Sequence, residues 1–118
     1  MAQVTLTSSV QQDGRQAACP GETVIFTCNV LDDFALQWIA GNQIPNTDPI
    51  SFLPNSRIDT IPRGDFTATL VSAIGNPNNT LKARFRSQLT VTVVEGSGLN
   101  GTQVTCNRRS VDLIVSCK

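Results

Sequence analysis

The sequence lacks histidine and tyrosine and carries no net charge. Without histidine it has no side chain that ordinarily titrates near neutral pH, and it contains neither a serine nucleophile elbow nor a glycine-rich phosphate loop. Its nine basic and nine acidic residues cancel, which removes the electrostatic basis for binding nucleic acid or an anionic membrane surface. These absences predict a protein that is not an enzyme, uses no cofactor and binds neither nucleic acid nor membrane.

The four cysteines include no Cys-x-x-Cys pair. Structural zinc ligands usually come as closely spaced pairs, so we expect no metal site and interpret the cysteines as disulfide partners, with three possible connectivities. Disulfides predict an oxidising compartment, at the cell surface or in the secreted fraction. Two Asn-x-Thr sequons, at Asn78 and Asn100, predict glycosylation sites and fit the same location.

The length of 118 residues suits one domain, residues 1–118, with a core of its own. The sequence shows no apolar run of membrane-spanning length and no N-terminal signal pattern. We therefore expect Met1 to begin a piece of a longer surface protein.

Apolar and polar residues alternate along most of the chain, which is typical of half-buried β-strands. The alternation predicts strands over residues 24–30, 34–40, 66–70, 87–93, 104–106 and 111–117, with Asn107 to Ser110 as a tight turn. The phase places Phe34 inward, as it does the main core candidates, which are Phe26, Leu36, Trp38, Leu89 and Val104. The same phase places Lys82, Arg84 and Arg86 on a solvent-exposed sheet face.

Residues 42–63 contain four of the six prolines and two apolar islands, at 50–53 and 58–61. Proline cannot donate a ladder hydrogen bond, so within sheets it is found mainly in edge strands. This stretch therefore predicts two short edge strands.

Cys28, Trp38 and Cys106 carry a resemblance to variable-set or I-set immunoglobulin domains, especially those of invertebrate cell-surface proteins. The segments that support it are 21–28, 36–38, 87–91 and 100–106. The resemblance implies an all-β fold, a two-sheet antiparallel Greek-key sandwich with the variable-type strand set, in which the prolines' edge strands are the extra strands C′ and C″. It also implies that Cys28 and Cys106 bridge the sheets beside the buried Trp38.

The resemblance further pairs Cys19 with Cys117. In variable-type domains the second half of the first strand runs parallel to the last strand, which would bring both cysteines to the same pole. The sequence departs from the family at Val104, where a tyrosine usually stabilises the corner before the second bridge cysteine. It also lacks the Phe-Gly-x-Gly bulge of antigen receptors in the last strand, so pairing through that bulge is not expected.

Immunoglobulin domains commonly bind partners through the sheet of strands C, C′, F and G. Here the outward positions of that sheet include Gln37, Ile39 and Ile114, whose apolar members either form a contact patch or are covered by neighbours. The resemblance therefore implies an extracellular recognition or adhesion module with a protein partner, homophilic or receptor–ligand. A soluble immune-type binder that uses its loop tips, or a spacer domain without a partner, is the alternative.

Two short charged motifs remain. Arg108 and Arg109, in the turn after Cys106, suit either an acidic partner or a solvated turn neutralised by Asp32 and Asp33. The triplet 63–65 is Arg-Gly-Asp, which integrins recognise in exposed loops. Because a three-residue match often arises by chance, and this arginine can instead pair with a nearby carboxylate, we do not expect an integrin partner.

Overall fold

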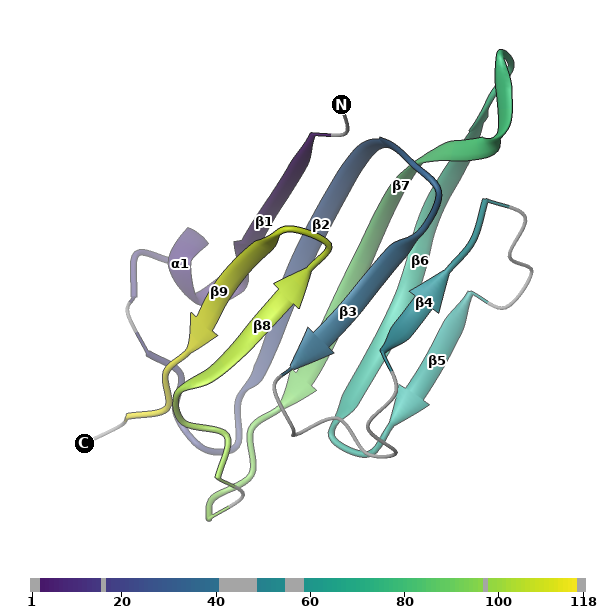
Figure 1. Cartoon of the computed structure of the whole chain (residues 1–118). Coiled ribbons are helices and arrows are strands. Elements are labelled where there is room, and N and C mark those ends of the chain that lie inside the picture. The colour runs from purple at the N-terminus through teal and green to yellow at the C-terminus, as the bar shows by residue number, and fades with distance from the viewer. Residues whose placement is uncertain (1–2, 16, 41–48, 55–58, 97, 117–118) are drawn as a thin grey trace.

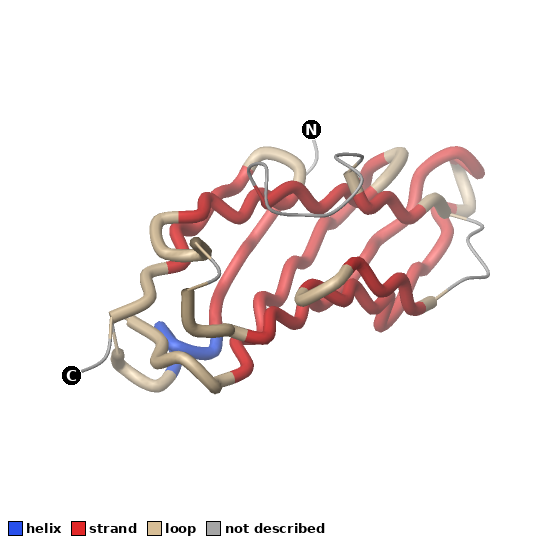
Figure 2. The backbone as a smooth tube through the Cα atoms, turned by 90° about the horizontal axis from the view of Figure 1, so that it is seen from below, coloured by secondary structure: helices blue, strands red, loops and turns tan. Residues whose placement is uncertain are grey.

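The chain forms two antiparallel sheets that pack face to face (Figures 1 and 2). The computed structural model describes residues 3–15, 17–40, 49–54, 59–96 and 98–116. In chain order the elements are β1 (Val4–Ser8), α1 (Ser9–Gln12), β2 (Thr23–Asp33), β3 (Leu36–Ala40), β4 (Ile50–Phe52), β5 (Thr60–Arg63), β6 (Phe66–Asn76), β7 (Asn79–Thr92), β8 (Thr102–Cys106) and β9 (Arg109–Leu113). One sheet has the order β1-β2-β7-β6-β5 and the other the order β4-β3-β8-β9, which confirms the predicted all-β sandwich.

The core lies between the sheets and follows the period of two along each strand. In β2 the even-numbered residues from Val24 to Val30 are buried, while the residues between them face outward or are half-buried. The predicted core residues Phe26, Leu36, Trp38, Leu89 and Val104 all have no exposed surface. The alternating pattern therefore places both sheets with their apolar sides on one shared core.

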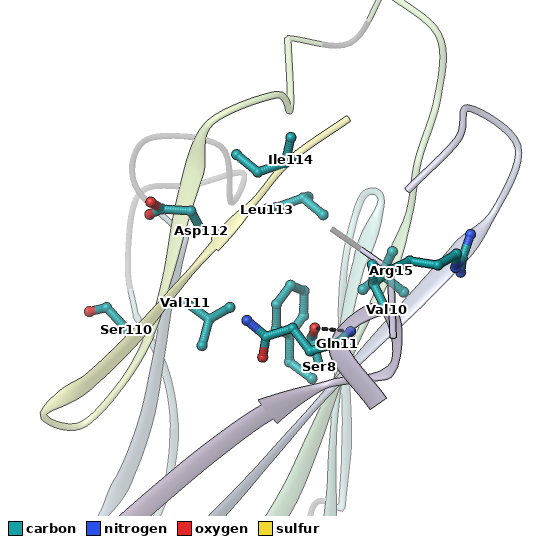
Figure 3. Close-up of a pocket in the computed structure, with 11 residues that line it drawn as sticks. Ser8, Val10, Gln11, Arg15, Ser110, Val111, Asp112, Leu113 and Ile114 are labelled. Atoms are coloured by element: carbon teal, nitrogen blue, oxygen red, sulfur yellow. Dashed lines mark hydrogen bonds between the residues drawn. The ribbon is translucent and has the colours of Figure 1, made fainter. Parts of the chain in front are cut away.

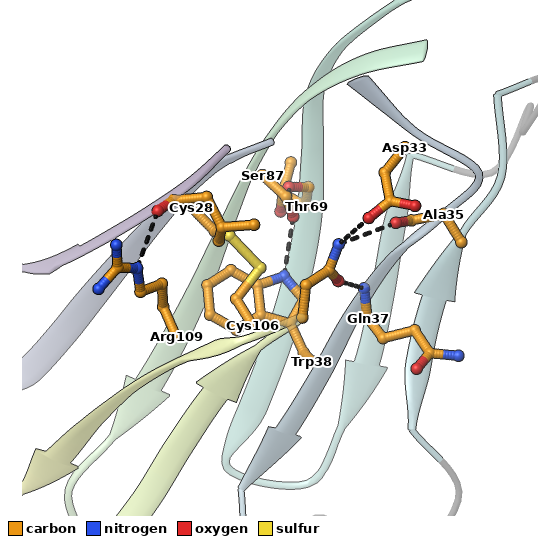
Figure 4. The surroundings of a disulfide bond; sticks show 11 residues. Cys28, Asp33, Ala35, Gln37, Trp38, Thr69, Ser87, Cys106 and Arg109 are labelled. Atoms are coloured by element: carbon orange, nitrogen blue, oxygen red, sulfur yellow. Dashed lines mark hydrogen bonds between the residues drawn. A yellow bond between two sulfur atoms is a disulfide. The ribbon is translucent and has the colours of Figure 1, made fainter. Parts of the chain in front are cut away.

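A disulfide joins the sheets at the centre of this core (Figure 4). The predicted bridge between Cys28 of β2 and Cys106 of β8 is present, with a Cα–Cα distance of 6.4 Å. Trp38 pairs with Cys106 in the sheet register and is fully buried beside the bridge. Two antiparallel sheets with this bridge fit an immunoglobulin-like sandwich.

The buried indole has a hydrogen-bond partner on the opposite sheet. Trp38 Nε1 donates to Ser87 Oγ of β7 at 2.9 Å, and Ser87 Oγ donates to the carbonyl of Thr69 in β6 at 2.7 Å (Figure 4). Ser87 itself is fully buried. This chain of two bonds satisfies polar atoms that would otherwise destabilise the core.

The first strand changes sheets, as the resemblance implied. β1 pairs with β2, and after the single helical turn α1 the chain returns so that Ala18 forms a parallel bridge with Val115. Ala18 N–H donates to the Ile114 carbonyl at 2.9 Å and Ser116 N–H donates to the Ala18 carbonyl at 3.1 Å. The next residue, Cys19, is disulfide-bonded, and its predicted partner Cys117 lies outside the described residues.

The two strands expected in the proline-containing stretch join different sheets. β4 pairs with β3, which is the expected position of strand C′. β5 pairs with β6 on the opposite sheet, whereas strand C″ of a variable-type domain extends the sheet of C, F and G. Pro62 lies in β5, at the edge of its sheet, where a missing N–H is tolerated.

The β6–β7 hairpin is longer than the alternation predicts and extends beyond the neighbouring strands (Figure 1). Its register shifts between Leu70 and Ser72, so Val71 is an extra residue. Such a bulge reverses the alternation of inward and outward side chains along the strand. Even-numbered residues face inward before Val71, whereas the odd-numbered Ala73 packs against the core after it. The alternation of apolar and polar residues therefore predicted only residues 66–70 of this strand, which in the structure continues to Asn76.

The inward placement of Phe34 is wrong. Its side chain is 53% exposed because it lies in the turn between β2 and β3, outside both strands. The turn is stabilised by the Phe34 N–H, which donates to Asp33 Oδ1 at 2.7 Å, and the Lys82 ammonium lies 5.0 Å from the centre of the Phe34 ring. A contact with a cation therefore replaces the expected core contact.

Asn100 stabilises the corner before β8, a role that the resemblance would assign to a tyrosine at the position of Val104 in β8. Its Oδ1 accepts a hydrogen bond from Val115 N–H at 2.9 Å, and the adjacent Gly101 N–H donates to the Leu113 carbonyl at 2.7 Å. Leu99 is buried beneath the corner. A side-chain amide and a buried leucine thus connect the corner to the last strand.

No helix in the described part of the chain is long and apolar enough to cross a bilayer.

We predict that Ser87→Ala lowers the free energy of unfolding by about 1–3 kcal/mol, because it leaves the Trp38 indole N–H buried without a partner. Urea denaturation of the oxidised protein, followed by tryptophan fluorescence, measures the loss. Ser72→Ala, at an exposed position of the neighbouring strand β6, is the control and should change stability by less than about 0.5 kcal/mol. Equal effects of the two substitutions would contradict the role given to Ser87.

Candidate interaction surface

The outer side of the four-stranded sheet carries the predicted binding residues Gln37 and Ile39, and Ile114 lies just after its last strand. We call this surface the four-stranded face, and its outward residues are Gln37, Ile39, Ser51, Gln103, Thr105, Ser110 and Asp112. The sheet register pairs Ile39 with Thr105 and Gln103 with Asp112, so these side chains lie side by side on one surface. Thr105 and Ser110 also share a hydrogen bond between their hydroxyls at 2.9 Å.

The four-stranded face differs in charge from the outer side of the other sheet. Among its outward residues only Asp112 is charged, whereas Arg84 and Arg86 lie exposed on β7 of the five-stranded sheet. Depletion of charge is typical of the central part of protein–protein interfaces. The two outer surfaces are therefore not equivalent as docking surfaces.

Three large apolar side chains are exposed on or beside the four-stranded face. Ile39 on β3 is 40% exposed, Ile114 just after β9 is 39% exposed, and Leu53 just after β4 is 53% exposed. Ile39 is the one on a central strand of the sheet, so it lies within the surface and not at its edge. The neighbouring strands therefore leave this predicted contact residue accessible.

Asn107 stabilises the turn at one end of this face, a role that no pattern in the sequence indicates. It has a positive φ of 52°, a conformation that asparagine tolerates better than most residues. Its Oδ1 accepts from Gln37 N–H at 2.8 Å, and its Nδ2 donates to the Ala35 carbonyl at 3.0 Å and to Asp33 Oδ2 at 3.3 Å (Figure 4). These bonds join the β8–β9 turn to the β2–β3 turn.

The two arginines of the β8–β9 turn have different surroundings. Arg108 is exposed in the turn itself. Arg109 Nε instead donates to the carbonyl of Val4 in β1 at 3.2 Å, which connects the edges of the two sheets. Among the described residues neither arginine forms an ion pair with Asp32 or Asp33, whose carboxylates accept hydrogen bonds from Asn76 and Asn107.

The Arg-Gly-Asp triplet forms the tip of the β5–β6 hairpin. Arg63 pairs with Phe66, so Gly64 and Asp65 are the two turn residues, and both are exposed. Gly64 has a positive φ of 61°. Arg63 donates to the Pro62 carbonyl at 3.0 Å and forms no ion pair within the described residues, so the expected carboxylate partner is not found there.

The two sequons lie at separate places. Asn78 is exposed in the turn of the β6–β7 hairpin, where its N–H donates to Asn76 Oδ1 at 2.8 Å. Asn100 is exposed in the corner before β8. Glycosylation of both sites stays a prediction.

An ion pair lies at the end of the sandwich opposite the β8–β9 turn. The Arg15 guanidinium donates two hydrogen bonds, each of 2.8 Å, to the two carboxylate oxygens of Glu22. The Cys19 N–H also donates to Glu22 Oε1, at 2.7 Å. The bonds from Arg15, and secondly the bond from Cys19, lower the pKa of Glu22 from its ordinary value of 4.5 to about 2.

Within the described residues, no group of three or more histidine, cysteine or acidic side chains could hold a metal ion. No protein-family model matches the sequence, and no curated protein matches it significantly.

We predict that Asn107→Gly lowers the free energy of unfolding by about 1–3 kcal/mol, because glycine accepts the positive φ but removes three side-chain hydrogen bonds. Asn107→Ala should cost more, since alanine also disfavours that backbone conformation. Chemical denaturation of both variants measures the difference. If Asn107→Gly is as stable as the natural chain, the side-chain bonds do not stabilise the turn.

We predict that Glu22→Gln weakens the acid sensitivity of folding. A folded-state pKa below the unfolded value means that Glu22 stabilises the fold above about pH 4.5, and that this contribution is lost as the pH falls towards 2. The variant should have a lower melting temperature than the natural chain near neutral pH, and the two should converge in acid. Thermal denaturation across this pH range measures the effect, with Glu95→Gln, an exposed carboxylate after β7, as the control.

Proposed function

We propose that the chain is an extracellular recognition module of variable immunoglobulin type that binds a protein partner, a second copy included, through the four-stranded face. The observation that carries the proposal is the exposure of Ile39 within a surface of mainly uncharged polar side chains. Burial of such an apolar side chain in a complex is favourable. The scarcity of charged side chains around it lowers the cost of removing water from this surface.

The strand arrangement supports a relationship to variable-type domains. Strand β4 occupies the position of C′, and the parallel bridge between Ala18 and Val115 matches the sheet change of the first strand. The pairing of β5 with β6 departs from that type and shortens the binding sheet at the β4 edge. The proposed contact surface is accordingly centred on β3, β8 and β9.

Recognition through loop tips receives less support. The β8–β9 turn consists of Asn107 and Arg108, and the β2–β3 turn of Phe34 and Ala35. Their connection through Asn107 leaves little freedom to adapt to a ligand. Loops that bind diverse ligands are typically longer and more mobile.

An extracellular location is consistent with the buried Cys28–Cys106 bridge. Such bridges persist in oxidising environments and are rare in the cytosol. The predicted sequons at Asn78 and Asn100 are both exposed, and neither lies among the outward residues of the four-stranded face. Glycans at these positions would leave Ile39 accessible.

We predict that Ile39→Arg with Ile114→Arg weakens self-association of the chain at least tenfold, because it places two desolvation-costly charges in the proposed contact. Sedimentation velocity over a range of protein concentrations measures the association. Ile25→Arg is the matched control, because Ile25 is 37% exposed on the outer side of the five-stranded sheet. Near-ultraviolet circular dichroism of Trp38 verifies the fold of each variant.

Unchanged association of the double variant would exclude the four-stranded face as the contact. A natural chain that stays monomeric at every concentration would show that the homophilic form of the proposal is wrong.

A further inference from the structure

A cleft opens between the first and last strands, away from the outward side chains of β3. It has a volume of about 430 Å³ and lies between the end of β1 with α1 on one side and β9 on the other (Figure 3). The residues that line it from β9 and its continuation are consecutive, from Ser110 to Ile114. The side chain of Gln11 points across the opening towards β9 (Figure 3). The cleft thus runs along the edge of a sheet.

The apolar floor of the cleft comes from the core. Val24 and Phe26 of β2, Val10 of α1 and Leu113 of β9 all line it, and all are buried. An apolar side chain that enters from the cleft would contact these residues and leave water. The volume lies within the range of ligand-binding pockets.

The backbone of β9 leaves hydrogen-bonding groups directed into the cleft. Among the strands that the structure describes, β9 is the last of its sheet and pairs only with β8. The carbonyl of Ile114 and the N–H of Ser116 point away from β8, since both bond to Ala18. Because the direction alternates along a strand, the N–H and C=O groups of Asp112 and Ser110 point the same way. No described residue bonds to these backbone groups.

Among the described residues, β1 pairs with β2 and forms no hydrogen-bonded ladder with this edge. The Arg109–Val4 hydrogen bond connects β9 to β1 at one end of the cleft, and the Ala18–Val115 bridge connects it to the returning chain at the other. Between these two contacts the chain turns away through α1, and Arg15 is paired with Glu22. Within the described part of the chain, β1 lies beside β9, and the backbone groups of Ser110 and Asp112 between the two contacts have no partner, while both ends of this short stretch are fixed.

We propose that this cleft binds an extended peptide segment of another protein, which adds as a strand to the open edge of β9. An unpaired row of alternating donors and acceptors is complementary to an extended backbone, and the apolar floor accepts alternate side chains of that strand. Ala18 already bonds to the same edge in this manner. The site shares Ser110 and Asp112 with the four-stranded face but opens at the edge of β9, away from Ile39, so the peptide is a second ligand and not the partner proposed above.

The probe is the capped peptide acetyl-Thr-Val-Thr-Val-Lys-amide, added at millimolar concentration to ¹⁵N-labelled chain. We expect shift changes at the amides of Ser110 and Asp112, and slower hydrogen exchange at these two amides than without peptide. The amides of Val111 and Leu113, directed at β8, should exchange slowly in both states. The control probe is the same peptide with every backbone amide methylated. It should not pair with the edge, because it cannot donate to the Ser110 and Asp112 carbonyls and its N-methyl groups block close approach of the two backbones.

Asp112→Pro removes the amide hydrogen directed into the cleft, and Asp112→Ala is its matched control. The proline variant should bind the peptide about three- to tenfold more weakly than the alanine variant, as expected for one lost hydrogen bond. Equal binding by the methylated peptide, or shift changes that avoid Ser110 and Asp112, would overturn the proposal without requiring either variant to fold. Protection of these amides by rising concentration of the chain alone would also overturn it, because the occupant would then be a second copy.

Ile39→Arg should leave peptide binding unchanged. If Ile39→Arg loses self-association but retains peptide binding, the contact at Ile39 and the cleft at β9 are separate sites. Either the proposed function or the peptide proposal can therefore fail alone.

Discussion

The bridge between Cys28 and Cys106, with the Trp38 indole packed beside it, determines how the two sheets face each other. It closes a loop of 78 positions, for which the chain-entropy model gives a stabilisation of about 4–5 kcal/mol. The indole adds a polar connection, since its hydrogen bond to Ser87 crosses from β3 to β7. A covalent bond and a hydrogen bond thus specify the same packing of the sheets. This packing determines which residues of β3 and β8 face the core and which face outward.

Sequence reasoning succeeded where a strand keeps a strict period of two. The parity of Trp38 places Gln37 and Ile39 outward, and the structure has both exposed. It failed where a single residue changes the phase or where a partner is chosen by distant geometry. The extra residue Val71 breaks the alternation, so the pattern did not predict the second half of β6. No residue pattern within β5 indicates that it pairs with β6.

The side-chain contacts that complete the surface were not predictable from patterns. Asn107 joins two turns that are about seventy positions apart in the sequence, and Arg109 bonds to a carbonyl in the first strand. Asn100 occupies the structural role that a tyrosine has in related folds, with different chemistry. Each contact depends on which strands become neighbours, so alternation alone carries no signal for it. The open edge of β9 is of the same kind, because it exists only where the first strand departs from the last.

The short connection of β8 to β9 has a consequence for how such a protein can diversify. With Asn107 and Arg108 as its only turn residues, and Asn107 bonded to the neighbouring turn, an inserted residue would break those bonds before it created a new contact. New specificity would therefore arise by replacement of side chains that point from the strands, one position at a time, and the backbone of this end would keep its shape.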